Sequence, residues 1–178
     1  MDVDYRNLVR ADRIHGSLLH DPNVFAEEMQ QIFVRGWAFV GHESETKNNG
    51  DWVKRQLGTE SVIMVRGDDG EINVLSNRCA HRGTALCWEH SGNDSFFQCT
   101  YHNWRFGLDG SLRAVPFPDG YSKPKEDLGL DRAGQVANYR GFVFANLDGS
   151  ACSIDGHLGD CLLYTSDAAD EGLGVDLG

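Results

Sequence analysis

Basic side chains are scarce in this sequence. Lysine and arginine number 16 against 27 aspartates and glutamates, which gives a formal net charge of −11 at pH 7. Because a surface of this sign repels phosphate groups, we expect neither nucleic acid nor an anionic membrane as a partner. No apolar run is long enough to cross a bilayer, and the opening residues are acidic where a signal peptide would be basic and then apolar. We therefore expect a cytoplasmic protein.

The sequence also lacks internal repeats, a glycine-rich phosphate loop and an even number of cysteines. At 178 residues it is about one domain long, and 40% of its residues are apolar, which is enough for a core. Nothing requires Cys87, Cys152 and Cys161 to pair, so reduced thiols are expected. Cys87 is interpreted as a small buried residue rather than a metal ligand.

What the sequence does contain is two short segments that each combine a cysteine with a histidine. Residues 79–83 read CAHRG and residues 99–104 read CTYHNW, which gives the pattern C-x-H-x17-C-x2-H. Two loops of this kind, facing each other, would hold a [2Fe–2S] cluster with both cysteines on one iron and both histidines on the other, the Rieske arrangement. A structural zinc ion and a coincidental spacing remain as alternatives, although common zinc fingers run Cys, Cys, His, His along the chain.

The residues around these pairs carry a family resemblance. The motifs CxHRG at 79–83 and CxxHxW at 99–104 resemble the Rieske domain of the large (alpha) subunit of aromatic-ring-hydroxylating dioxygenases, over about residues 10–160. The resemblance implies that the histidines ligate through Nδ1, which leaves Nε2–H free. It implies a [2Fe–2S] cluster whose cofactor-binding and metal-ligating residues are Cys79, His81, Cys99 and His102.

Two positions separate this chain from other Rieske proteins. Thr84 and Tyr101 stand where the Rieske proteins of respiratory cytochrome complexes have the cysteines of an extra disulfide, so that bridge cannot form here. Asn103 stands where the dioxygenase family usually has glycine. Asparagine is the non-glycine residue best able to adopt a positive φ, so we expect the turn to survive.

The hydrophobic pattern predicts a mainly β fold of small antiparallel sheets with an N-terminal helical segment. Asp21 and Pro22 are a helix-start signal, and a helix is expected over 22–35. Its apolar face has little in this chain to cover it, so the chain should be prone to aggregate. Strands are expected at 53–57, 61–66, 71–75, 96–98 and 135–147, a hairpin at 104–114, and turns at 67–70 and 91–94.

These elements predict a division of the chain into four parts. They are an N-terminal helical segment at 1–45, a Rieske [2Fe–2S] domain at 46–150, the start of a truncated catalytic region at 151–160, and a tail at 161–178. The tail resembles a translated sequencing-library adapter, and it carries four acidic residues and no basic ones. On this interpretation the chain is the front of a longer protein, cut near Asp160.

The resemblance implies an oxidoreductase that puts O2 into an aromatic ring. Electrons would come from a ferredoxin or flavin reductase and pass to a mononuclear Fe(II), held by two histidines and a carboxylate, usually in an adjacent subunit of a trimer with or without a beta subunit. No His-x4-His pair follows the motif, and His157 is the only later histidine. We therefore assign no catalytic residue to this chain and expect the Fe(II) only in the full-length protein.

Two other functions stay open. A free-standing Rieske ferredoxin would carry electrons without an active site, but it has no evident use for the helix before Asp51. A zinc-stabilised binding module would contain zinc and show no visible colour. The sequence does not identify the substrate.

Overall fold

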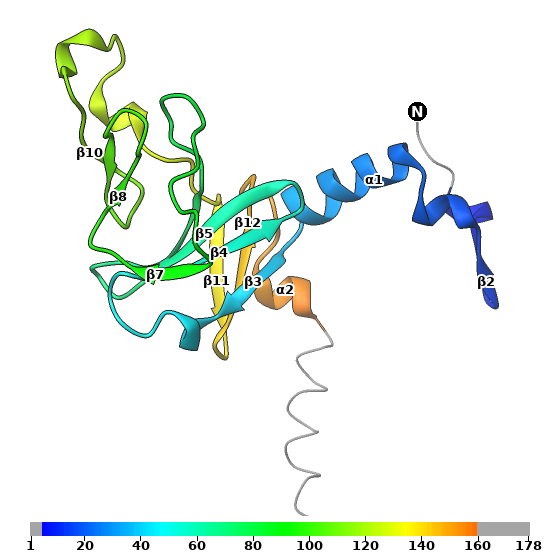
Figure 1. Ribbon diagram of the computed structural model, residues 1–178. Helices are drawn as coiled ribbons and strands as arrows, with labels where there is room; N and C mark the ends of the chain where they lie inside the picture. Colours follow the sequence, from blue (N-terminus) through cyan, green and yellow to red (C-terminus); the bar gives the residue numbers. More distant parts are fainter. Residues whose placement is uncertain (1–4, 160–178) are drawn as a thin grey trace, which may run out of the picture.

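The N-terminal part of the chain forms an arm. The structure is a computed structural model that describes residues 5–159. In Figure 1 the arm, drawn in blue, projects away from the β-sheets. Its elements are η1 (Tyr5–Asn7), β1 (Val9–Arg10), β2 (Arg13–Ile14), η2 (Gly16–Leu19), α1 (Pro22–Glu28) and η3 (Met29–Val34).

The helix starts where the sequence predicts. The Asp21 carboxylate accepts a hydrogen bond from the Asn23 N–H at 2.8 Å, which caps α1. The predicted helix over 22–35 is α-helical only to Glu28, and η3 continues it as a π-helix. In that wider helix the Arg35 N–H reaches back five residues to the Gln30 carbonyl.

A four-stranded antiparallel sheet forms the centre of the molecule, in the order β6-β5-β4-β7. The strands expected here are confirmed, with ends shifted by a residue or two, and so is the turn at 67–70. The turn expected at 91–94 is wrong, because residues 91–93 pair with β4. The strands are β4 (Asp51–Leu57), β5 (Glu60–Arg66), β6 (Ile72–Ser76) and β7 (Ser91–Asn93).

A second sheet has three strands in the order β11-β12-β3. The single strand expected at 135–147 is a hairpin, whose turn residues Arg140 and Gly141 have φ values of 51° and 89°. β3 lies within the N-terminal segment at 1–45 that is expected to be helical, and pairing with β12 makes it a strand. The elements are β3 (Ala38–His42), η4 (Glu43–Glu45), β11 (Gln135–Tyr139) and β12 (Phe142–Asn146).

The third sheet, in the order β10-β9-β8, forms a lobe at one end of the molecule, upper left in Figure 1. The predicted strand before Cys99 and the predicted hairpin at 104–114 are both confirmed. A long loop with two short helices follows, and α2 ends the described chain. The bounds are β8 (Phe97–Gln98), β9 (Arg105–Phe106), β10 (Leu112–Ala114), η5 (Pro118–Gly120), η6 (Lys125–Leu128) and α2 (Ile154–Leu158).

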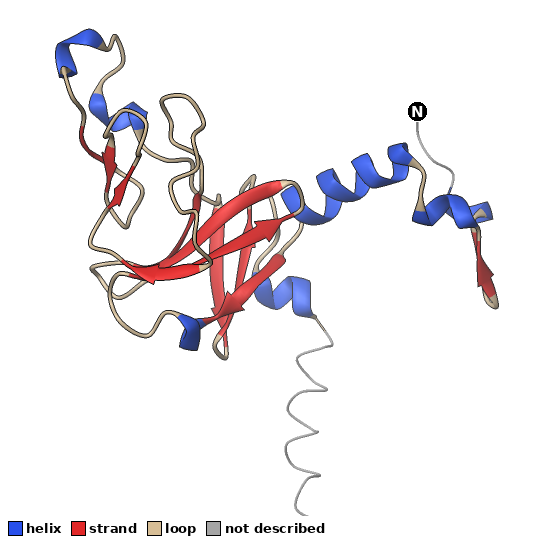
Figure 2. Cartoon of the chain, in the orientation of Figure 1, coloured by secondary structure: helices blue, strands red, loops and turns tan. Residues whose placement is uncertain are grey.

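Strand β5 separates two hydrophobic cores. Because side chains alternate across a strand, Ile63 and Val65 pack into one core while Val62 and Met64 pack into the other. The first core contains Cys79, Cys99 and Trp104 from the ligand loops. The predicted mainly β fold of antiparallel sheets with a helical arm is confirmed, as Figure 2 shows by the colouring of helices and strands.

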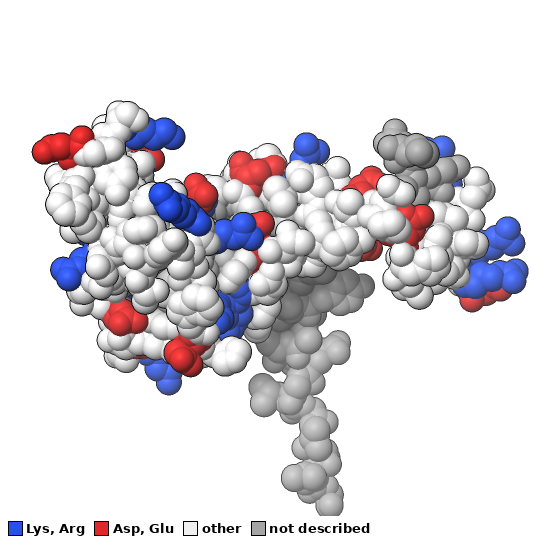
Figure 3. Space-filling view, turned by 45° about the horizontal axis from the view of Figure 1, so that its top comes forward, with Lys and Arg blue, Asp and Glu red and all other residues white. Residues whose placement is uncertain are grey.

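The surface charge is mixed. On the face drawn in Figure 3, acidic and basic side chains are interspersed over both the sheets and the arm. The net negative charge is therefore not gathered into one patch on that face. Among residues 5–159, no helix has the length and apolar character needed to span a bilayer.

Candidate metal centre

Two loops with the same backbone closure carry the four predicted ligands. In the first loop, between β6 and β7, the Cys79 N–H donates to the Thr84 carbonyl at 2.8 Å and the Gly83 N–H donates to the Cys79 carbonyl at 2.8 Å. In the second loop, between β8 and β9, the N–H of Cys99 reaches the carbonyl of Trp104 at 2.9 Å. Sheet strands at both ends hold these loops in place.

The fourth residue after each cysteine has a left-handed backbone. Gly83 has a φ of 72° and Asn103 a φ of 57°. The Asn103 N–H donates to the Cys99 carbonyl at 2.9 Å, which matches the Gly83 bond in the first loop. The prediction that asparagine would preserve this turn is confirmed, because it tolerates a positive φ better than other non-glycine residues.

The two thiols lie together in the interior. Cys79 is 3% exposed and Cys99 is 1% exposed, both belong to the same hydrophobic core, and Cys99 is among the groups that act on the Cys79 thiol. Burial raises the pKa of the Cys79 thiol, and two donors to its sulfur, the backbone N–H groups of His81 and Arg82, act in the opposite direction. A metal ion would deprotonate these sulfurs, and the N–H groups would then stabilise the thiolate.

The two imidazoles also form a pair. His81 Nδ1 lies 3.1 Å from His102 Nδ1, so the atoms that the resemblance implies as ligands face each other. Two nitrogens bound to one tetrahedral metal, each at about 2.0–2.1 Å, would be about 3.3 Å apart. Burial and the neighbouring His102 lower the pKa of His81, which favours the neutral imidazole that binds metal.

The four side chains thus make a sulfur pair and a nitrogen pair. This arrangement fits a two-iron centre, in which each pair holds one iron. A structural zinc ion would need all four side chains around one point. Within the described part of the chain, no group of three or more His, Cys, Asp or Glu side chains is arranged to hold a single metal ion.

Each histidine ring is stacked against an aromatic side chain. The Trp104 indole is parallel to the His81 ring, with centroids 4.9 Å apart and an interplanar angle of 1°. Tyr101 stacks on His102 with centroids 3.9 Å apart. Trp104 is 1% exposed, and the sequence gave no signal for its contact with Tyr121.

Asn77 is a second residue that sequence reasoning missed. Its Oδ1 accepts hydrogen bonds from the N–H groups of Leu86 at 3.1 Å and Cys87 at 2.8 Å, and its Nδ2 donates to the Cys87 carbonyl at 2.9 Å. Asn77 is 2% exposed. It therefore fixes the far end of the first ligand loop to the end of β6.

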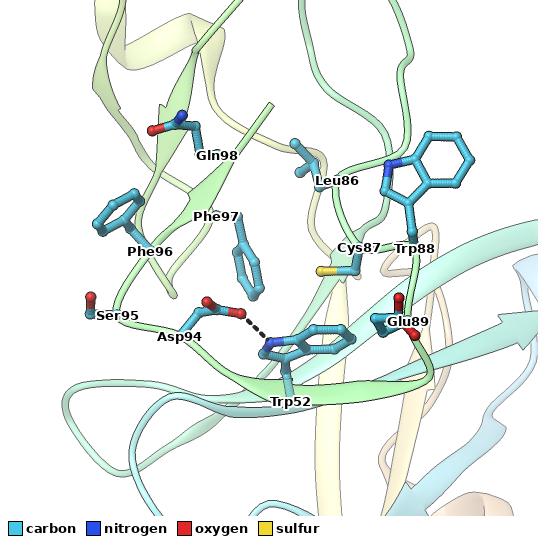
Figure 4. Close-up of a pocket in the computed structure, with 10 residues that line it drawn as sticks. All are labelled: Trp52, Leu86, Cys87, Trp88, Glu89, Asp94, Ser95, Phe96, Phe97 and Gln98. Atoms are coloured by element: carbon cyan, nitrogen blue, oxygen red, sulfur yellow. Dashed lines mark hydrogen bonds between the residues drawn. The ribbon is translucent and has the colours of Figure 1, made fainter. Parts of the chain in front are cut away.

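A hollow of about 400 Å³ lies beside this loop, lined by residues such as Trp52, Trp88 and Phe97 (Figure 4). Asp94 accepts a hydrogen bond from Trp52 Nε1 at 2.7 Å across it. Cys87 is 6% exposed, which confirms that it is a buried residue. Burial raises the pKa of its thiol to about 12, so it stays protonated at neutral pH.

Paired thiols and paired imidazoles on two loops, between small antiparallel sheets, define an iron–sulfur protein of the Rieske class. Comparison with known families gives the same answer. The family model described as the Rieske [2Fe-2S] domain matches residues 36–139. The chain belongs to this family.

The relatives are subunits of oxygenases. The chain is 43% identical over 146 residues to the N,N-dimethyl phenylurea N-demethylase subunit alpha of Sphingobium sp. (strain YBL2), which covers 80% of this chain and 32% of that subunit. It is 35% identical to the biphenyl 2,3-dioxygenase subunit alpha of Rhodococcus jostii (strain RHA1), in a match that covers 95% of this chain and 37% of that subunit. A solved structure of a naphthalene 1,2-dioxygenase variant bound to phenanthrene superposes with a TM-score of 0.84 at 34% identity. The match covers 92% of this chain and 38% of the dioxygenase chain. The chain spans less than two-fifths of each relative.

Proposed function

We propose that Cys79, Cys99, His81 and His102 hold a [2Fe–2S] cluster through which this chain transfers electrons. The observation that carries the proposal is the division into a buried sulfur pair and a half-buried nitrogen pair whose Nδ1 atoms are 3.1 Å apart. When bound, such a cluster takes up and releases one electron, and its histidine-held iron is easier to reduce than one held only by cysteines.

The residues of the chain would divide the work. The cysteine ligands are buried, so the side of the cluster that they hold would be closed to water. The backbone N–H groups of His81 and Arg82 would stabilise the negative charge on the Cys79 sulfur. Because the Nδ1 atoms of the histidines face each other, Nε2 of each ring lies on the side away from that pair and can donate a hydrogen bond outward. The half-buried imidazoles are then the route by which electrons pass to and from a partner.

We further propose that the chain is the electron-transfer part of a ring-hydroxylating oxygenase alpha subunit. A ferredoxin or flavin reductase would supply electrons, and a mononuclear Fe(II) outside this chain, in a trimer of alpha subunits with or without a beta subunit, would receive them. The names of the relatives support this proposal, and so does the share of their length that the chain spans. They include a demethylase and dioxygenases, so we assign no substrate.

The domain boundaries are part of this proposal. The Rieske domain expected at 46–150 would begin earlier, with β3, because β3 pairs with β12 and the family model starts at residue 36. The segment before it would be the helical arm, and residues 151–159 would begin the catalytic region. The tail expected at 161–178 lies outside the described residues.

A free-standing Rieske ferredoxin is the second candidate. The similarity to the biphenyl 2,3-dioxygenase subunit alpha extends over 95% of this chain, so it includes most of the arm. An electron carrier without an active site needs no such arm. This observation favours the oxygenase subunit over the carrier.

Removal of one ligand from either pair tests the proposed centre. We expect Cys99→Ser and His102→Ala each to abolish the reddish-brown colour and the rhombic spectrum of the reduced protein, because three ligands cannot hold both irons. Metal analysis and electron paramagnetic resonance of the purified full chain measure this result.

The matched controls lie outside the pairs. Cys152→Ser and His157→Ala alter an exposed thiol just before α2 and an exposed imidazole within it, and both variants should keep the iron and the spectrum. Zinc in place of iron in the unsubstituted chain, or an unchanged spectrum in Cys99→Ser, would contradict the proposal.

A further inference from the structure

Two aromatic rings enclose His81, and neither belongs to the ligand pattern. The Trp104 indole covers one face of the imidazole in parallel stacking. Tyr121 stands edge-on to both rings, with its centroid 5.0 Å from that of Trp104 and 6.0 Å from that of His81, at 89° in each case. The two aromatic rings thus cover one face and one edge of the histidine.

A hydrogen bond joins these two aromatic side chains. Trp104 Nε1–H donates to the Tyr121 hydroxyl oxygen at 3.2 Å. Because Trp104 is 1% exposed, water has little access to replace that partner. The hydroxyl of Tyr121 therefore fixes the rotation of the indole, and the indole in turn fixes the plane of the His81 ring.

Tyr121 comes from the long loop after β10, and this loop is anchored on both sides of it. Val115 and Leu128 pack, like Tyr121, against the core that contains the two thiols. Between them the chain passes through Phe117, an 86% exposed residue with a left-handed φ of 55°. The loop thus holds Tyr121 against the core although its tip faces solvent.

The other histidine has no such enclosure. Among residues 5–159, the ring stacked on His102 is that of Tyr101, which is 60% exposed. One imidazole of the pair is therefore covered by buried aromatic groups, while the other is covered by a ring at the surface. The chemistry of the two histidines should differ accordingly, because exposure and hydrogen bonding around a cluster set its potential.

We propose that Tyr121 is a positioning residue for His81. Its hydroxyl holds the Trp104 indole flat against the imidazole, and its ring closes the remaining edge against water. Tyr121 acts on the centre through Trp104 and the His81 ring. The inference rests on the proposed ligand role of His81.

The test removes only the hydroxyl. In the full chain purified with its cluster, Tyr121→Phe should keep the iron content but shift the reduction potential upward and change the spread of the g values. The reduced centre carries one more negative charge than the oxidised one, so water admitted beside His81 favours the reduced form. Tyr139→Phe, which deletes a hydroxyl on β11 outside this core, should move neither quantity.

A double-mutant cycle tests the route through Trp104. Trp104→Phe removes the donor and keeps a ring, so adding Tyr121→Phe to it should produce no further shift in potential. Additive shifts, or an unchanged potential and g spread in Tyr121→Phe, would overturn the inference. If Tyr121→Phe loses iron, the reduction potentials of Trp104→Phe and Tyr139→Phe are compared instead. A shift in Trp104→Phe alone supports the inference, and no shift in either variant contradicts it. A colourless unsubstituted chain would instead contradict the proposed function.

Discussion

At the scale of single residues, Asn77 shows how a buried amide can organise the loop that carries Cys79 and His81. Its side chain makes three hydrogen bonds to the backbone of Leu86 and Cys87. Asn77→Ala would leave these buried groups without partners, so we expect a loss of about 2–4 kcal/mol in the free energy of unfolding. Urea denaturation of the two proteins measures the difference.

The control for this substitution is another asparagine. Asn49→Ala removes one exposed hydrogen bond, from Nδ2 to the Asp68 carbonyl at 3.0 Å. Its effect should stay within about 0.5 kcal/mol. Equal losses in the two variants would show that Asn77 has no special part in fixing the loop.

The contrast between Asn103 and Asn77 explains which residues could be predicted. Asn103 acts within its own turn, so its left-handed φ of 57° follows from local backbone preference. Asn77 acts on residues that are 9 and 10 positions away. Its neighbours in the sequence give no sign of those contacts, because they exist only after the loop has folded back.

At the scale of secondary structure, the hairpin of β9 and β10 depends on Asp109. Its carboxylate accepts hydrogen bonds from the Ser111 N–H at 3.1 Å and the Ser111 hydroxyl at 2.7 Å. Burial alone would raise the pKa of Asp109, but these bonds and Arg113 outweigh it and leave the pKa below its ordinary value.

This lowered pKa predicts a pH dependence. The stabilisation is complete above the pKa of the unfolded chain, about 3.9, and is lost as pH falls through the lower pKa of the folded state. We expect Asp109→Asn to lower the melting temperature at pH 7 and to have a smaller effect below pH 3. A difference in melting temperature that is constant from pH 7 to pH 2 would contradict this assignment.

The strand β7 shows tertiary pairing overriding a local turn signal. Ser91 to Asn93 contain turn-forming residues, yet they pair with β4. Gly92 is the residue that allows it, because a Cβ there would lie 2.8 Å from the Trp52 ring. The pairing of β7 is completed by Asn93 Nδ2, which donates to Asp51 at 2.8 Å.

At the scale of the whole molecule, the arm exposes apolar side chains. Phe25 is 54% exposed and Ile32 is 52% exposed, and the arm projects away from the sheets. We expect the chain to self-associate through this surface, and Phe25→Ser with Ile32→Ser should shift it toward monomer. Light scattering over a concentration series measures the change.

Phe117 provides the comparison, because it is 86% exposed at the tip of the loop after β10. Phe117→Ser should reduce association less than the double substitution in the arm. A monodisperse unsubstituted chain, or an equal effect of Phe117→Ser, would show that the arm is not the cause.

The sequence by itself determined the ligand loops, the helix start and most strands, because each depends on residue type and short spacing. The tertiary structure alone decided that β3 joins β12 and that Tyr121 reaches Trp104. These contacts join residues 17 to more than 100 positions apart. Only burial of a shared core brings such residues together, and local preference carries no record of it.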